Sequence, residues 1–154
     1  MAYYTKVLQP DETVKVIGRL HWSIYLRAII VLLIALAVLL GSNWLPDPDW
    51  QPYALLASAV IGVLGLLLLL AAAIRRRATE IVVTDRRVIF KRGLITRHTV
   101  EMNVSRIETV DVEQGLGGRI WGYGTVLIRG TGVGLEPLVG VGSPLVIRNA
   151  IVVG

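Results

Sequence analysis

The feature that most constrains this chain is a pair of long apolar segments separated by a short acidic connector. The first segment runs from Ile24 to Leu45, and the second, Tyr53 to Ile74, contains no charged residue. Each is about 22 residues long, and a helix needs roughly 20 residues to cross the hydrocarbon core of a bilayer. Buried helices of a soluble domain are the alternative, but two adjacent runs of this length and purity argue against it. We therefore expect a transmembrane helical hairpin.

The charges around these segments predict the orientation of the hairpin. The connector, Ser42 to Gln51, contains two aspartates and no Lys or Arg, whereas the second segment is followed directly by Arg75, Arg76 and Arg77. Basic residues also precede the first segment. Because basic residues stay on the cytoplasmic side, both ends of the hairpin should face the cytoplasm. The sequence thus predicts a multi-pass protein of the plasma (inner) membrane with both termini in the cytoplasm.

The rest of the chain is long enough for one small domain. We expect a cytoplasmic segment at residues 1–21, the transmembrane hairpin at 22–77 and a cytoplasmic β domain at 78–154. The net charge of +5 comes largely from the arginine triplet, so it marks topology and does not predict a nucleic-acid partner. The absence of cysteine from the sequence excludes disulfides and thiol chemistry.

Alternation of apolar and polar residues predicts β structure on both sides of the hairpin. Residues 14–21 predict a short strand, whose partner strand must lie beyond the hairpin, so the two cytoplasmic ends should meet. After the hairpin, short strands separated by turns are typical of an antiparallel barrel or sandwich. Ser143 and Pro144 have the form of an N-cap and first residue of a helix at 144–150. The strands are expected at residues 80–84, 87–91, 94–102, 107–114, 125–129 and 135–141.

Two strings carry a family resemblance. They are Thr84-Asp85-Arg86-Arg87 and Gly118-Arg119-Ile120-Trp121-Gly122-Tyr123-Gly124. They resemble the bacterial pleckstrin-homology (PH) domain of YdbS-like membrane proteins, and the lead-in through residues 7–12 and 19–22 is similar as well. The resemblance implies a bent antiparallel sheet, or partial barrel, closed by a C-terminal helix. The expected helix is short and rich in β-branched residues, which departs from that pattern.

The glycine-rich stretch from Gly115 to Gly124 is the first candidate for chemistry. It lacks the Lys of a phosphate-binding loop and the spacing of a dinucleotide-binding turn, so we expect no cofactor there. We expect instead a loop of sharp bends in which Trp121 and Tyr123 close the open end of the sheet. The alternative for Trp121 and its neighbour Arg119 is a surface contact with lipid or a partner protein.

Catalytic constellations are absent from the sequence. His21 and His98 lie far apart and have no carboxylate cluster at metal-ligand spacing, and no serine lies in a nucleophile elbow. Asp111 and Glu113 share a strand face and are candidates for an acid–base pair, but exposed carboxylates opposite arginines are a commoner arrangement. We therefore expect no enzyme activity and no metal.

The basic residues are more informative candidates. At the expected bilayer surface, each arginine of the triplet gains about 1 kcal/mol from anionic headgroups, so anionic phospholipids are an expected partner. A plain topology signal is the alternative. Further basic pairs are scattered over the first strands of the β domain and predict a solvated face, not a headgroup pocket. These pairs are Arg86-Arg87, Lys91-Arg92 and Arg97-His98.

A row of small residues on the second apolar segment predicts helix packing. Ala54, Ser58 and Gly62 recur every four residues, so they share one side of the helix and allow another backbone to approach closely. The other helix is either the first segment of the same chain or part of a homo-oligomer or another membrane protein. The leading functional hypothesis is a membrane-anchored, non-enzymatic scaffold or protein-interaction module. An anionic-lipid sensor is the second, and an accessory subunit of a transporter or channel the third.

Overall fold

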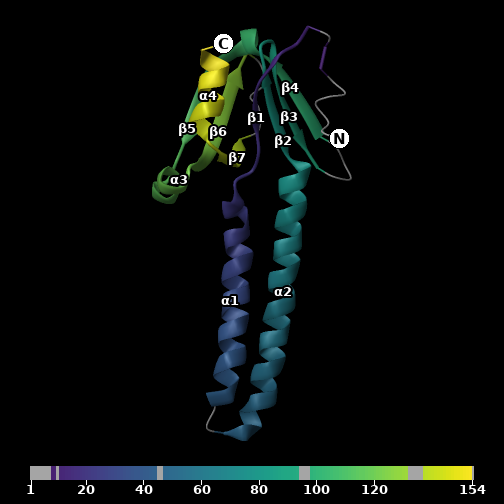
Figure 1. The fold of residues 1–154 in the computed structure, drawn as a ribbon, viewed down its shortest axis with the longest axis vertical. Helices are drawn as coiled ribbons and strands as arrows, with labels where there is room; N and C mark the ends of the chain where they lie inside the picture. Colours follow the sequence, from purple (N-terminus) through teal and green to yellow (C-terminus); the bar gives the residue numbers. More distant parts are fainter. Residues whose placement is uncertain (1–7, 10, 45–46, 94–97, 132–136, 154) are drawn as a thin grey trace. The chain divides into compact units, whose positions relative to one another are not determined.

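The chain forms two compact units. The structure, a computed structural model, describes residues 8–9, 11–44, 47–93, 98–131 and 137–153 (Figure 1). Residues 22–74 form one unit, and residues 1–21 together with 75–154 form the other. We call them the helical unit and the β unit. The β unit is therefore assembled from segments on both sides of the helical unit in the sequence.

The helical unit contains two long helices, as predicted. Helix α1 spans Leu26–Gly41 and is flanked by 3-10 turns at Trp22–Tyr25 and Ser42–Trp44. Helix α2 spans Gln51–Ala78, follows a 3-10 turn at Pro48–Trp50, and continues at its end into the β unit. By length and composition, both helices are able to cross a membrane.

The two helices pack through small side chains. Gly65 of α2 lies so close to α1 that a Cβ atom added to it would be 2.7 Å from Leu32 Cδ2. The buried residues repeat at seven-residue intervals, which is the spacing of a left-handed coiled-coil seam. They are Ala28 and Ala35 on α1, Ser42 directly after it, and Ser58, Gly65 and Ala72 on α2.

Within the described residues, the β unit has seven strands in two antiparallel sheets. The sheets have the orders β1-β2-β3-β4 and β5-β6-β7. The strands are β1 (Val14–Gly18), β2 (Glu80–Thr84), β3 (Arg87–Arg92), β4 (His98–Asn103), β5 (Ile107–Glu113), β6 (Tyr123–Gly130) and β7 (Leu138–Gly142). Two helices complete the unit, α3 (Leu116–Trp121) between β5 and β6, and α4 (Pro144–Val152) after β7.

The segment before the helical unit joins the two sheets. Strand β1 pairs with β2, where Gly18 lies opposite Ile81. The chain then continues onto β7, where the Gly142 N–H donates to the Arg19 carbonyl (3.0 Å) and the His21 N–H donates to the Gly140 carbonyl (2.8 Å). The prediction that the two ends flanking the hairpin meet is therefore confirmed.

Helix α4 closes the core between the sheets. Its buried Ile147 packs over Gly18, where an added Cβ would lie 2.7 Å from Ile147 Cδ1. Aliphatic side chains from both sheets and α4 fill this core, as expected for a PH-like fold. The core residues are Ile81, Val83, Val88, Phe90, Val126, Ile128, Leu138, Val141, Ile147 and Ile151.

One local prediction is wrong, whereas the helix predicted at residues 144–150 is confirmed as α4, with Ser143 at its N-cap position and Pro144 in its first turn. Residues 116–121 of the expected glycine-rich loop form helix α3, which ends at Gly122 in the left-handed conformation (φ 72°) that glycine adopts without steric cost. Ser143 precedes α4, but its side chain makes no capping hydrogen bond. At φ 51° it turns the chain from β7 into α4, and its N–H donates to the Gly122 carbonyl (2.8 Å). Residues 94–97 and 132–136 of the predicted strands and turns lie outside the described residues.

Candidate functional site

The first of the two family-like strings forms a structural clamp. The guanidinium of Arg87 donates twice to the Glu12 carboxylate, from Nε to Oε1 (2.8 Å) and from Nη2 to Oε2 (2.7 Å). Its Nη1 donates to Glu101 Oε2 (2.7 Å). The Glu12 side chain is fully buried in this pair. The hydrogen bond from Arg87 therefore lowers the pKa of Glu12 to about 2, although burial acts to raise it.

Neighbouring polar groups fasten the same two segments. Asp85 Oδ1 accepts the Thr13 N–H (3.1 Å), and the Asp85 N–H donates to the Thr13 carbonyl (3.1 Å). The hydroxyl oxygen of Thr84 accepts the Arg87 N–H (3.0 Å) and lies 2.8 Å from Glu12 Oε1. The string thus joins the segment before the helical unit to the β2–β3 turn. The prediction of a solvated face is wrong for Arg87, because its guanidinium is largely buried and pairs with Glu12 and Glu101.

The opposite end of the β unit is where the chain passes into and out of the helical unit. We call this end, formed by His21, residues 75–78 and α3, the junction end. Here Arg76 Nε donates to the Leu20 carbonyl (3.1 Å). The His21 ring stacks on Tyr123, with centroids 5.3 Å apart and planes 23° apart. Burial, and then the positive charge of Arg76, lowers the pKa of His21.

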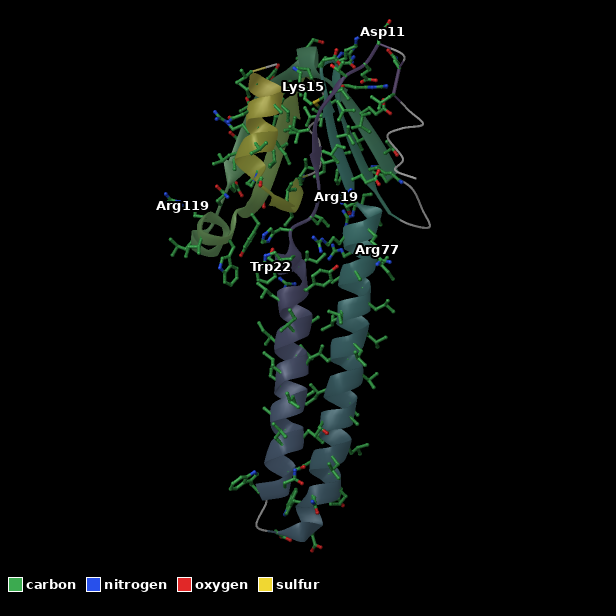
Figure 2. The ribbon with its side chains drawn as sticks, in the orientation of Figure 1. Asp11, Lys15, Arg19, Trp22, Arg77 and Arg119 are labelled. Atoms are coloured by element: carbon green, nitrogen blue, oxygen red, sulfur yellow. The ribbon has the colours of Figure 1, made fainter. Side chains whose placement is uncertain are left out.

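Strand register brings further cations to the junction end. Strand β2 starts two residues after α2 ends, and its first residue, Glu80, pairs with Lys91, so the end of β3 and the start of β4 lie there as well. Figure 2 shows Arg19, Arg77 and Arg119 toward this end of the β unit and Asp11 at the other. Of the three predicted basic pairs, the described residues of two lie in one group at this end, where Arg92 and His98 are exposed as a solvated face requires, while Arg86-Arg87 lies at the clamp. The members of the group are Arg19, Arg75, Arg76, Arg77, Lys91, Arg92, His98 and Arg119, while Glu80 and Glu113 are the acidic residues nearby.

The second family-like string builds a compact tip at the same end. Gln114 Nε2 donates to the carbonyls of Gly118 (3.3 Å) and Tyr123 (3.0 Å), which ties the chain before α3 to the helix and to the start of β6. A Cβ at Gly118 would collide with the Tyr123 carbonyl oxygen, and one at Gly124 would lie 2.8 Å from Gln114 Cγ. Close packing therefore requires glycine at these two positions.

Helix α3 exposes its large apolar side chains. Leu116 is 82% exposed, Ile120 78% and Trp121 49%, and Arg119 is exposed as well. The prediction that Trp121 closes the open end of the sheet is wrong, because the helix carries this side chain to the surface. Tyr123, the other predicted plug, is half-buried against His21. The alternative of a surface residue at Trp121, beside Arg119, agrees with the observed exposure.

The row of small residues on α2 faces α1. Ser58 is buried, and a Cβ added to Gly62 would lie 3.9 Å from the Cβ of Ala35, while Ala54 is half-buried. The Ser58 hydroxyl donates to the Leu55 carbonyl (2.8 Å) of its own helix. This arrangement corresponds to the first of the two predicted alternatives, packing within one chain.

The remaining candidates for chemistry lie apart. Asp111 and Glu113 are on β5, but the residues opposite them on β6 are Leu127 and Thr125, not arginines. His21 is engaged with Tyr123, whereas His98 begins β4. Among the residues that the structure describes, no group of three or more His, Cys, Asp or Glu is placed to hold a metal ion.

Two bent antiparallel sheets closed by a C-terminal helix define the β unit as PH-like. A family model described as the bacterial PH domain matches residues 22–151, from the start of the helical unit to the last turn of α4. The chain belongs to the bacterial PH domain family. No curated protein and no solved structure matches it.

Proposed function

We propose that this chain is a membrane-anchored, non-enzymatic PH module of the YdbS-like type, which acts as a scaffold or protein-interaction subunit at the cytoplasmic face of the plasma (inner) membrane. The observation that carries the proposal is the division of the β unit by the helical unit. Residues before α1 and after α2 share one set of hydrogen bonds and one clamp. Both ends of the hairpin must therefore lie on the same side of any membrane that it crosses.

The distribution of charge selects that side. The described end of α2 carries Arg75, Arg76 and Arg77, all exposed, whereas Asp47 and Asp49 lie between the helices. Under the positive-inside rule the β unit is then cytoplasmic. The arrangement differs from a β domain attached by one linker, because the chain enters the helical unit after β1 and returns from it just before β2.

The edges of the sheets support an interaction role. Among the described strands, β4 pairs with β3 alone and β5 with β6 alone, so each leaves one edge for strand addition by a partner. The partner would be a second copy of the chain or another membrane protein. Because Ser58 and Gly62 already face α1, a homo-oligomer would use another face of the hairpin.

A second candidate function is an anionic-lipid sensor. The basic residues at the junction end favour this function. Here Arg75 and Arg77 would contact headgroups while Arg76 holds the Leu20 carbonyl. An accessory subunit of a transporter or channel has less support. The buried hydroxyls of Ser42 and Ser58 donate to nearby backbone carbonyls, of Leu39 and Leu55, so this function has no polar residue group among the described residues of the helical unit to support it.

Reporter fusions in the full chain test the placement. A fusion at Asp49 should report the outside of the membrane, and a fusion after Gly154 should report the cytoplasm. A cytoplasmic connector would overturn the proposed function.

Lipid binding by the full chain in nanodiscs distinguishes the scaffold from the lipid sensor. Selective, salt-sensitive retention of anionic lipids favours the sensor, whereas equal retention of neutral and anionic lipids favours the scaffold.

A further inference from the structure

The exposed tip of α3 has no part in the clamp, the core or the strand edges. We propose that α3 is a membrane-inserting element, whose Leu116 and Ile120 enter the interfacial layer of the bilayer that the hairpin crosses. The inference rests on the proposed membrane anchoring. The β unit would then be attached to the membrane in three ways: by the hairpin, by the exposed arginines that contact headgroups, and by the apolar side chains of α3.

The first support is the shape of the tip. Leu116 and Ile120 are four residues apart on a helix, so they share one face, and both are more than three-quarters exposed. Their backbone is held by Gln114 and by the close packing of Gly118 on Tyr123. The fold thus holds two aliphatic side chains exposed at the surface, and contact of these apolar groups with water is unfavourable.

The second support is the position of the tip within the β unit. Tyr123 follows α3 by two residues and stacks on His21, which directly precedes the first apolar segment at Trp22. Arg76, next to the end of the second apolar segment at Ile74, is hydrogen-bonded to Leu20. Since a hairpin in a bilayer has both of these chain positions at the membrane boundary, α3 lies at the end of the β unit that faces the headgroups.

The third support is charge. Arg119 lies between Leu116 and Ile120 in the sequence and is exposed, and Arg75 and Arg77 are exposed at the same end. Apolar side chains bordered by Arg or Lys are typical of segments that lie in the interface of an anionic membrane. Anionic phospholipid headgroups complement these cations.

The absence of cysteine from the chain makes the test direct. The full chain carrying Ile120→Cys, labelled with an environment-sensitive fluorophore, is reconstituted into vesicles of phosphatidylethanolamine and phosphatidylglycerol. Val152→Cys is the matched control, because Val152 is 60% exposed and α4 leads away from the junction end, as Figure 1 shows. Leu116→Cys provides a second label on the tip. Lipids spin-labelled near the headgroup and aqueous iodide serve as the two quenchers.

We expect the spin-labelled lipids to quench the label at Ile120 at least about twofold more than the label at Val152, and iodide to do the reverse. Equal quenching by iodide at both positions would overturn the inference. A label at Ile120 shielded from both quenchers would also overturn it and would indicate a protein contact. In either case, if the chain resists alkaline extraction from the vesicles, only the inference about α3 fails and the proposed membrane anchoring is still supported. Alkaline extraction of the chain would refute the anchoring itself.

Discussion

The two units have opposite interiors. In the β unit the buried residues are large aliphatic side chains such as Ile81, Ile128 and Leu138. In the helical unit they are alanines and serines, while most of the leucines and isoleucines, such as Leu66 at 58% exposure, point outward. A core that excludes water gathers its largest apolar groups inside, whereas helices in lipid gain nothing from doing so and pack through small residues. The small-residue interior of the helical unit is thus of the kind that the proposed membrane anchoring predicts.

Polar groups are also treated differently in the two units. The β unit buries a charged pair, Glu12 and Arg87, that joins distant parts of the chain. The helical unit satisfies its buried hydroxyls locally, from Ser42 to Leu39 and from Ser58 to Leu55. Loss of a polar group should therefore unfold the first unit, whereas added volume should disturb the second.

The largest expected effect is that of Glu12→Gln. It leaves Arg87 without its buried counter-charge, and breaking a buried ion pair costs about 3 kcal/mol or more. Pulse proteolysis of the reconstituted chain in denaturant should show this loss in the β unit. Asp11→Asn, at an exposed neighbouring position, is the control and should change stability by less than about 0.5 kcal/mol. Equal stability of the two variants would contradict a stabilising clamp.

The same pair predicts a pH dependence. Because the pKa of Glu12 falls from 4.5 to about 2 on folding, its contribution is fully present above pH 4.5 and is lost as the pH falls from 4.5 toward 2. The loss should reach about 3 kcal/mol, at 1.36 kcal/mol for each pKa unit. Unfolding of the β unit followed between pH 6 and pH 2.5 measures it. The Glu12→Gln variant should show a flatter profile over this window, and an unchanged profile would refute the assignment to Glu12.

A smaller effect is expected from Gly65→Ala in the helical unit. The new methyl group would meet Leu32 Cγ at 2.8 Å, and overpacking of this kind costs about 1–3 kcal/mol. Gly62→Ala is the matched control, since its methyl group would lie at an ordinary contact distance of 3.9 Å from Ala35. Disulfide crosslinking between cysteines placed on α1 and α2 should slow for the first variant alone. Equal rates for both would contradict the packing at Gly65.

The smallest effect concerns the exposed arginines. Arg75→Gln and Arg77→Gln together should reduce anionic-lipid retention by about 1 kcal/mol for each residue at low salt, and by less at physiological salt. Native mass spectrometry of the chain released from mixed nanodiscs counts the retained lipids. Arg76→Gln is a comparison with a different expected outcome, because it also frees the Leu20 carbonyl. If the double variant retains as much anionic lipid as the unmodified chain, the arginine triplet acts only as a topology signal.

Local patterns predicted much of the fold. The purity of the two apolar segments predicted α1 and α2. Alternation predicted the ends of the strands after the hairpin within about two residues where the structure describes them, whereas β1 ends at Gly18, three residues before the predicted end. The partner of β1 was also predictable, because no other sheet was available to it. In contrast, α3 was predicted as a loop, since glycine disfavours helices by propensity, and only the packing of Gly118 and Gly124 explains why glycine is present.

The features missing from the sequence analysis depend on distant pairs. Glu12 and Arg87 are 75 residues apart, about half the length of the chain, so no spacing rule connects them. The gathering of Lys91 and Arg92 near Arg75 depends on the register of β2 and β3, which the strand pattern alone leaves open. The exposure of Leu116 and Ile120 follows from the direction in which α3 projects, and it too required the structure.

The position of β1 has a consequence for biosynthesis. Translation produces β1 before either apolar helix and β2 only after both, so the strand leaves the ribosome long before its partner exists. Under the proposed membrane anchoring, the β unit could not finish folding until the insertion machinery had released the hairpin with both ends on one side. Lys15 and Arg19, in and beside this short strand, protect it from pairing with other chains meanwhile. A chain inserted with the wrong topology would keep β1 and β2 apart and would remain a target for proteases.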